Sequence, residues 1–265
     1  MTVPEDNAPH RLLGRRGPGV LFAAAALAAQ LWAGSAQGQV LIQPVIAELG
    51  ARQKTVVVSL SMTEGAAAPM RMQAQVLRWR QDLEGKAVTE PADDVLVSPA
   101  IAELRPGQRQ VFRVALRNPR PLQEEMAYRL VFEDVAEPPL DEAGKPVAGL
   151  HIRMRYDLPL MVAQAAKPVQ LMRWKSCPSQ AAAQDAGAQA CVRLLNAGNR
   201  RVKIQSLRVA GQGWEQELQI KEGSTVLAGA QREWRVALPS GQAVVSDVVV
   251  QTARDETLRA ESGGF

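Results

Sequence analysis

The stretch LHIRMRYDLPLM, residues 150–161, alternates apolar and polar side chains along its whole length. One face would carry Leu150, Ile152, Met154, Tyr156, Leu158 and Leu160. A period of two predicts a half-buried strand, and this row is longer than a typical strand of about 5–6 residues allows. Two interpretations stay open. The stretch is either a long core strand or an edge strand that offers its apolar row and unpaired backbone to another chain.

The same alternation occurs on both sides of this stretch. Earlier runs lie at 56–62, 70–76, 111–117 and 126–133, with Gly and Pro turns between them. After the segment AQAAKP, residues 163–168, short apolar runs resume and continue to Thr252. No long helical period occurs after residue 38. Closely spaced short strands with regular turns predict an all-β chain with one β-sandwich in each half, 39–163 and 164–265.

The first 38 residues predict an export signal. Three arginines among residues 11–16 precede an apolar run at 19–33, and small residues follow. A run this short fits a cleaved signal peptide better than a membrane span of about 20 residues. We expect cleavage after Ala36 or Gly38, with an uncleaved anchor as the alternative.

Composition argues against most catalytic chemistry. The 265 residues are 46% hydrophobic and 4% aromatic, with a net charge of +4 and two histidines. That charge is too small to indicate nucleic-acid binding. His151 is the only histidine after the signal, and no nucleophile elbow, phosphate loop or zinc spacing occurs. The adjacent Glu124 and Glu125 are typical of solvated loop charge. We therefore expect no enzyme activity, no cofactor and no metal.

Cys177 and Cys191 are the only cysteines. An even pair in an exported chain predicts a disulfide, and their spacing excludes a redox CxxC motif. Closing a loop of this size stabilises a fold by roughly 3 kcal/mol in the chain-entropy model. We expect the bridge to join two neighbouring strands.

Seven segments taken together resemble one family, the PapD-like periplasmic chaperones of chaperone–usher pilus assembly. They are VLIQPVIAEL (40–49), VLRW (76–79), VLVSPAIAELRPGQRQVFRV (95–114), AYRLVFEDV (127–135), LHIRMRYDLPLMV (150–162), NAGNRRVKIQSL (196–207) and VLAGAQREWRV (226–236). The segment at 95–114 is the most specific. The resemblance covers the whole chain after the signal, and it is strongest to the branch that serves spore-coat-U-type pilins.

The resemblance implies a fold and a function. The fold is two immunoglobulin-like sandwiches at an angle, L-shaped, with a cleft between them. The function is periplasmic: the chaperone lends a strand to a pilin subunit that lacks one, then delivers the subunit to an outer-membrane usher. The implied lent row is Leu150, Ile152, Met154, Tyr156 and Leu158. Neither nucleic acid nor metal is an implied partner, and self-association of the free chaperone stays open.

The sequence departs from the family at the anchor for the pilin's C-terminal carboxylate. The two basic positions of the family correspond here to Ile46 and Pro159, and neither donates a charge-assisted hydrogen bond. The candidate replacements are Arg129 first, then Arg113 and Arg109. Arg129 ranks first because it lies mid-strand among apolar neighbours, where an arginine needs an anionic partner.

Two further expectations complete the sequence-based hypothesis. Asp134 is the nearest match to the family's acid before the linker, with Glu133 beside it, so an ion pair between the domains is expected through one of these two residues, Asp134 first. The competing function is a secreted immunoglobulin-like adhesion or carbohydrate-binding module. A carbohydrate-binding module is expected to present an aromatic platform on an exposed face. The tryptophans after the signal are widely spread in the sequence, which counts against this function: Trp79, Trp174, Trp214 and Trp234.

Overall fold

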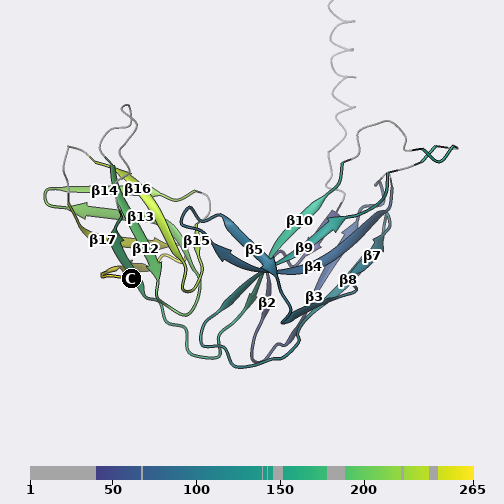
Figure 1. Ribbon diagram of the computed structural model, residues 1–265, viewed down its shortest axis with the longest axis horizontal. Coiled ribbons are helices and arrows are strands. Elements are labelled where there is room, and N and C mark those ends of the chain that lie inside the picture. Colours follow the sequence, from purple (N-terminus) through teal and green to yellow (C-terminus); the bar gives the residue numbers. More distant parts are fainter. Residues whose placement is uncertain are drawn as a thin grey trace, which may run out of the picture. The chain divides into compact units, whose positions relative to one another are not determined.

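The computed structural model describes residues 40–66, 68–138, 140–141, 143–145, 152–177, 189–221, 224–238 and 244–265. The predicted signal at 1–38 lies outside the described residues, as do Leu150 and His151. Residues 39–265 form one compact unit. Every regular element in the described part is a strand (Figure 1). None of the described segments is a helix long and apolar enough to cross a bilayer.

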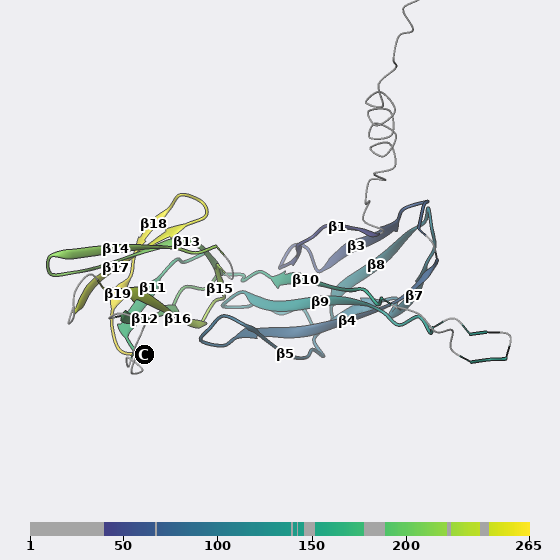
Figure 2. The same cartoon turned by 90° about the horizontal axis from the view of Figure 1, so that it is seen from above.

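The strands before residue 163 form the first sandwich. One of its sheets has the order β1-β3-β8-β6, and the other has the order β2-β10-β9-β4-β5, with β7 also paired to β4. The bounds are β1 Val40–Gln43, β2 Ala47–Leu49, β3 Thr55–Met62, β4 Met70–Gln81, β5 Ala87–Pro91, β6 Val95–Ser98, β7 Ile101–Leu104, β8 Arg109–Leu116, β9 Met126–Asp134 and β10 Arg155–Val162. Figure 2 shows β10, β9, β4 and β5 side by side. All pairs are antiparallel except β2 with β10.

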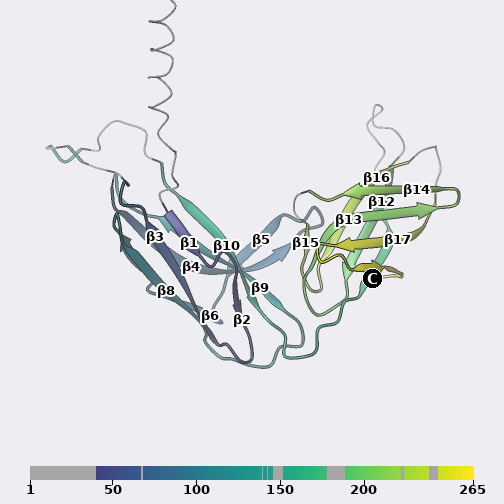
Figure 3. The same ribbon diagram turned by 180° about the vertical axis from the view of Figure 1, so that it is seen from behind.

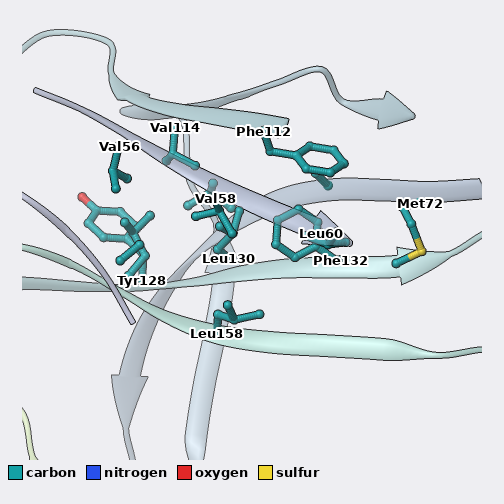
Figure 4. Packing of buried hydrophobic residues seen from close by; sticks show 14 of the residues in the cluster. Val56, Val58, Leu60, Met72, Phe112, Val114, Tyr128, Leu130, Phe132 and Leu158 are labelled. Atoms are coloured by element: carbon teal, nitrogen blue, oxygen red, sulfur yellow. The ribbon is translucent and has the colours of Figure 1, made fainter. Parts of the chain in front are cut away.

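The alternating residues of these strands meet in a core between the two sheets (Figure 4). Phe112 of β8 packs edge-on against Phe132 of β9, with ring centres 4.8 Å apart. Tyr128 is also buried, and its hydroxyl donates a 2.7 Å hydrogen bond to Asp94. The tyrosine thus adds a large apolar surface to the core while its polar atom stays satisfied.

A second sandwich contains the remaining strands. Its sheets have the orders β16-β12-β11-β19 and β14-β13-β17-β18, with β15 also paired to β13. The bounds are β11 Met172–Ser176, β12 Gln189–Asn196, β13 Val202–Gly211, β14 Trp214–Gln219, β15 Thr225–Val226, β16 Gln231–Ala237, β17 Val245–Thr252, β18 Thr257–Arg259 and β19 Glu261–Ser262. The predicted disulfide is confirmed: Cys177 and Cys191 are bonded, with Cα atoms 5.2 Å apart, and link the paired strands β11 and β12.

The all-β fold with two sandwiches confirms the expected fold class. The strand expected over 150–161 differs at its start, because β10 begins only at Arg155. Its neighbour β9 ends at Asp134, whose backbone N–H donates a 2.8 Å hydrogen bond to the carbonyl of Met154. Before Met154 there is no further β9 residue to pair with, so the described residues 152–154 run on as irregular chain.

Candidate functional site

One edge of β10 is open over most of its length. On one side, β9 pairs with all of β10, from Arg155 to Val162. On the other side, β2 pairs only with the last three residues, from Leu160 onward. Within the described residues, the edge from Arg155 to Pro159 therefore has no partner strand. Such an edge presents unpaired N–H and C=O groups to any chain that can pair with them.

The apolar row changes from exposed to buried along this edge. Ile152 is 72% exposed and Met154 39% exposed. Tyr156 is half-buried against the core, and Leu158 and Leu160 are buried within it. Figure 4 shows Leu158 directed toward Tyr128 and Leu130. The exposed start of the stretch thus fits the interpretation as an open edge, and its buried end fits the interpretation as a core strand. Leu158, expected in the lent row, is a core residue of the first sandwich, because its side chain faces the interior between the two sheets.

Asp134 does not join the two sandwiches. Its carboxylate Oδ1 accepts hydrogen bonds from the backbone N–H groups of Arg71 at 3.3 Å and Ala136 at 3.0 Å, both in the first sandwich. The expectation of an interdomain contact is therefore wrong for this residue. Asp134 lies buried at the end of β9, where its carboxylate holds the turn that leaves the strand. Burial raises the pKa of Tyr156, and the nearby Asp134 carboxylate raises it further.

Arg129 lies in mid-β9, opposite Pro159 of β10. Its guanidinium carbon is 3.7 Å from the centre of the Trp79 ring, a cation–π contact. Its Nε is 3.6 Å from Oδ1 of Asp157, and its side chain is 20% exposed. Burial lowers the pKa of Arg129, and the Asp157 charge partly opposes this shift. Trp79 and Asp157 thus fix the guanidinium of Arg129 beside the open edge. Its Nε is buried and forms no hydrogen bond within the described residues.

The other anchor candidates lie elsewhere. Arg109 and Arg113 are exposed on β8, which belongs to the opposite sheet of the sandwich (Figure 3). The structure does not bring them beside β10. Ile46 lies just before β2 and is exposed, and Pro159 is half-buried. Of the three arginines, Arg129 alone neighbours the open edge.

A different carboxylate connects the two sandwiches. Glu125, directly before β9, has a side chain that is only 3% exposed and forms an ion pair with Arg201. Its Oε1 also accepts a 3.0 Å hydrogen bond from the backbone N–H of Arg201. The same guanidinium contacts Glu48 of β2 at 2.5 Å. The sequence pattern of adjacent glutamates indicated solvated charge, so this contact was missed.

The turn between β4 and β5 supplies a second connection. The Gln81 side chain donates a 2.9 Å hydrogen bond to the carbonyl of Thr225 and accepts a 3.0 Å bond from the N–H of Leu227. Trp79, Met161 and Leu227 share a small buried cluster beside it. A cavity of about 510 Å³ lies next to these contacts, lined in part by Trp79, Gln81 and Glu125.

The tryptophans do not form the platform that a carbohydrate-binding module would use. Trp79, Trp174 and Trp234 are buried, and Trp214 is half-buried against the second core. In the described part of the chain, these four rings therefore serve packing.

Comparisons with known proteins agree with the fold. Residues 39–166 match the family described as Pili and flagellar-assembly chaperone, PapD N-terminal domain. No curated protein matches the chain. Many solved structures match it.

Three solved structures are similar over most of the chain. The first is the CsuC–CsuE chaperone–tip adhesion subunit pre-assembly complex from archaic chaperone-usher Csu pili of Acinetobacter baumannii, with 18% identity, a TM-score of 0.60 and coverage of 86% of this chain and 100% of that chain. The class 5 fimbriae chaperone CfaA has 11% identity, a TM-score of 0.57 and coverage of 85% and 100%. The Salmonella enterica SafA pilin in complex with the SafB chaperone has 15% identity, a TM-score of 0.51 and coverage of 85% and 97%.

At 11–18% identity, the similarity to these structures shows the fold alone. The family relationship rests on the match of residues 39–166. The match covers the first sandwich, which contains the open edge of β10. Residues 39–166, which include the whole first sandwich, belong to the N-terminal domain family of the PapD-like pilus-assembly chaperones, and the two-sandwich fold is similar to that of solved pilus chaperones.

Proposed function

We propose that this protein is a periplasmic chaperone that lends the open edge of β10 to pilin subunits of the spore-coat-U-like type and delivers them to an outer-membrane usher. In this proposal residues 1–38 are the cleaved signal, and the two domains are 39–163 and 164–265. One observation supports it above all. The exposed Ile152 and Met154 lead directly into a strand edge without a partner.

The physical basis is β-augmentation. A pilin strand that pairs with the edge satisfies the free N–H and C=O groups, and alternate side chains enter the pilin's groove. Burying each aliphatic side chain contributes roughly 1.5–3 kcal/mol. Complexes of related chaperones with a tip adhesion subunit and with a pilin support this class of partner. The edge is equally open to a second copy of the chain, so self-association of the free protein belongs to the same proposal.

Amide hydrogen exchange tests the proposed edge. We expect the amides of residues 152–158 that point away from β9 to exchange quickly in the free protein and to become protected when a purified pilin is added. Amides of β5, the edge strand at the other side of the same sheet, serve as the control because no pilin strand is proposed there. Protection of β5 without protection of 152–158 would contradict the proposal.

We also propose Arg129 as the cation that anchors the pilin carboxylate. We expect Arg129→Ala to weaken pilin binding by about tenfold, the value of one charge-assisted hydrogen bond. Arg129→Lys should restore part of the affinity because it keeps the charge. Arg113→Ala, an equal change of charge on the opposite sheet, should have little effect. Equal pilin affinity of the wild type and Arg129→Ala in a titration would place the anchor elsewhere.

A further inference from the structure

Charged side chains lie on the outer face of β10, along its open edge. Arg155 and Asp157 alternate with the apolar row of this strand, and both are exposed. Nη1 of Arg155 is 3.3 Å from Oε2 of Glu133 on β9, and its Nη2 is 3.9 Å from Oδ2 of Asp157. Oδ1 of Asp157 is in turn 3.6 Å from Nε of Arg129. Negative and positive charges therefore alternate beside the edge to which a client strand would pair.

The backbone groups of the same two residues point toward the open edge. The N–H of Asp134 on β9 donates a 2.8 Å hydrogen bond to the carbonyl of Met154, so Met154 directs its backbone groups toward β9. Successive residues of a strand direct these groups to opposite sides. Those of Arg155, Asp157 and Pro159 consequently face away from β9, and Pro159 has no N–H to offer. Between Arg155 and Pro159, a foreign strand thus finds its N–H donors at Arg155 and Asp157.

Both charged side chains have capacity for a further partner. The two cations near Asp157 lie 3.6 and 3.9 Å from its carboxylate, which is beyond hydrogen-bond distance. No residue in the described ranges donates a hydrogen bond to this carboxylate. Arg155 donates one N–H to Glu133, and a guanidinium carries five N–H donors. A client strand beside β10 can therefore pair with Arg155 and Asp157 without displacing their contacts to β9.

We propose that Arg155 and Asp157 select the register of the client strand by pairing with side chains of opposite charge on it. The inference rests on the proposed strand lending. A strand along this edge places two outward-facing side chains, two residues apart in its sequence, beside Arg155 and Asp157. Opposite charges at neighbouring positions of adjacent strands stabilise a sheet, and like charges destabilise it.

The apolar row cannot select this register alone. A slip of one residue turns every client side chain to the wrong face of the sheet, so alternation excludes it. A slip of two residues keeps apolar side chains on the inner face, so alternation permits it. The same slip moves a client acid from Arg155 to Asp157, where two carboxylates repel each other. The charged pair thus distinguishes registers that the apolar side chains leave equivalent.

The direction of the client strand fixes the order of its charges. β2, which occupies the end of the same edge, runs parallel to β10. We expect the client to run parallel as well, with an acid beside Arg155 and a base beside Asp157. Its sequence then reads acid, apolar, base in this segment.

Three labelled peptides, acetylated and amidated at their ends, test this pairing. They share flanks of alternating Val and Thr and differ at two central outward positions, which are Glu then Lys, Lys then Glu, or Thr at both. Anisotropy titrations give their affinities for the wild type, Arg155→Asp/Asp157→Arg, Arg155→Gln/Asp157→Asn and Glu103→Arg/Arg105→Glu. The last variant is the control, because it reverses an exposed ion pair at β7, in the same sheet but not beside β10. Circular dichroism checks that each variant folds, as expected for changes to exposed pairs.

We expect the Glu-then-Lys peptide to bind the wild type about tenfold more tightly than the Lys-then-Glu peptide, with the Thr peptide between them. The order of the two charged peptides should reverse in Arg155→Asp/Asp157→Arg, disappear in Arg155→Gln/Asp157→Asn and persist in the control. High salt should reduce the difference.

Two results would overturn the inference, and they differ in what they leave standing. If the charge-reversed variant keeps the wild-type order, or the neutral variant keeps the difference, Arg155 and Asp157 do not select the register. The neutral variant decides this point even where the charge-reversed variant fails to fold. Strand lending stands in that case as long as the Thr peptide binds. Failure of all three peptides to bind the wild type would overturn strand lending itself, and the register inference with it.

Discussion

Replacing Ile152 and Met154 together with aspartate is expected to abolish pilin binding while the chaperone still folds. Each substitution removes roughly 1.5–3 kcal/mol of apolar burial in the complex. Each also places a carboxylate where it has no partner, which adds a desolvation cost. Together these terms predict an affinity loss of about a thousandfold or more. The free chaperone should keep its stability, because both side chains lie exposed outside its own core.

Pilin binding is measured by titration with purified subunit, and folding by circular dichroism and a denaturation midpoint. Val88→Asp/Ile101→Asp is the matched control, since these side chains are 48% and 46% exposed in the same sheet but away from β10. The control should bind pilin normally. If the Ile152/Met154 variant still binds with wild-type affinity, strand lending through this edge is wrong.

The sequence predicted the strand at 150–161 but not where its apolar row is buried. Alternation reports that a strand has two unlike faces, and it holds equally for Ile152 and for Leu160. Ile152 and Leu160 differ in burial because the neighbouring strands β2 and β9 reach only part of the stretch. The short β2 covers β10 only from Leu160 onward, and β9 ends at Asp134. These lengths depend on tertiary pairing, so the open edge became visible only in the structure.

The ion pairs, too, depend on tertiary contacts that the sequence predicts only in part. The sequence ranked Arg129 first among three arginines because of its buried surroundings, and the structure places it alone beside β10. It proposed Asp134 for the contact between the sandwiches and assigned Glu125 to solvent, whereas the structure places the contact at Glu125. Glu125 meets Arg201 across a separation of 76 residues. Local periodicity cannot predict a contact between residues so far apart in the sequence. The disulfide was predictable because the chain has only two cysteines.

Removing the Glu125 carboxylate is expected to lower the free energy of unfolding far more than removing an exposed charge such as Glu124. Glu125→Ala leaves the backbone N–H of Arg201 without its acceptor and leaves the guanidinium with Glu48 alone. Breaking a buried ion pair costs about 3–5 kcal/mol, and the lower end applies because Arg201 keeps one partner. Glu125→Gln should fall between the wild type and Glu125→Ala, since its amide oxygen can still accept the backbone hydrogen bond.

Urea denaturation followed by tryptophan fluorescence measures this loss, because tryptophans lie in both sandwiches. Glu124→Ala removes an identical charge from the exposed neighbouring position and should leave the midpoint unchanged. Equal midpoints for Glu125→Ala and Glu124→Ala would show that the Glu125–Arg201 contact is as weak as an ordinary surface pair. A midpoint lowered only in Glu125→Ala would establish that this carboxylate, which the sequence pattern assigned to solvent, stabilises the contact between the two sandwiches.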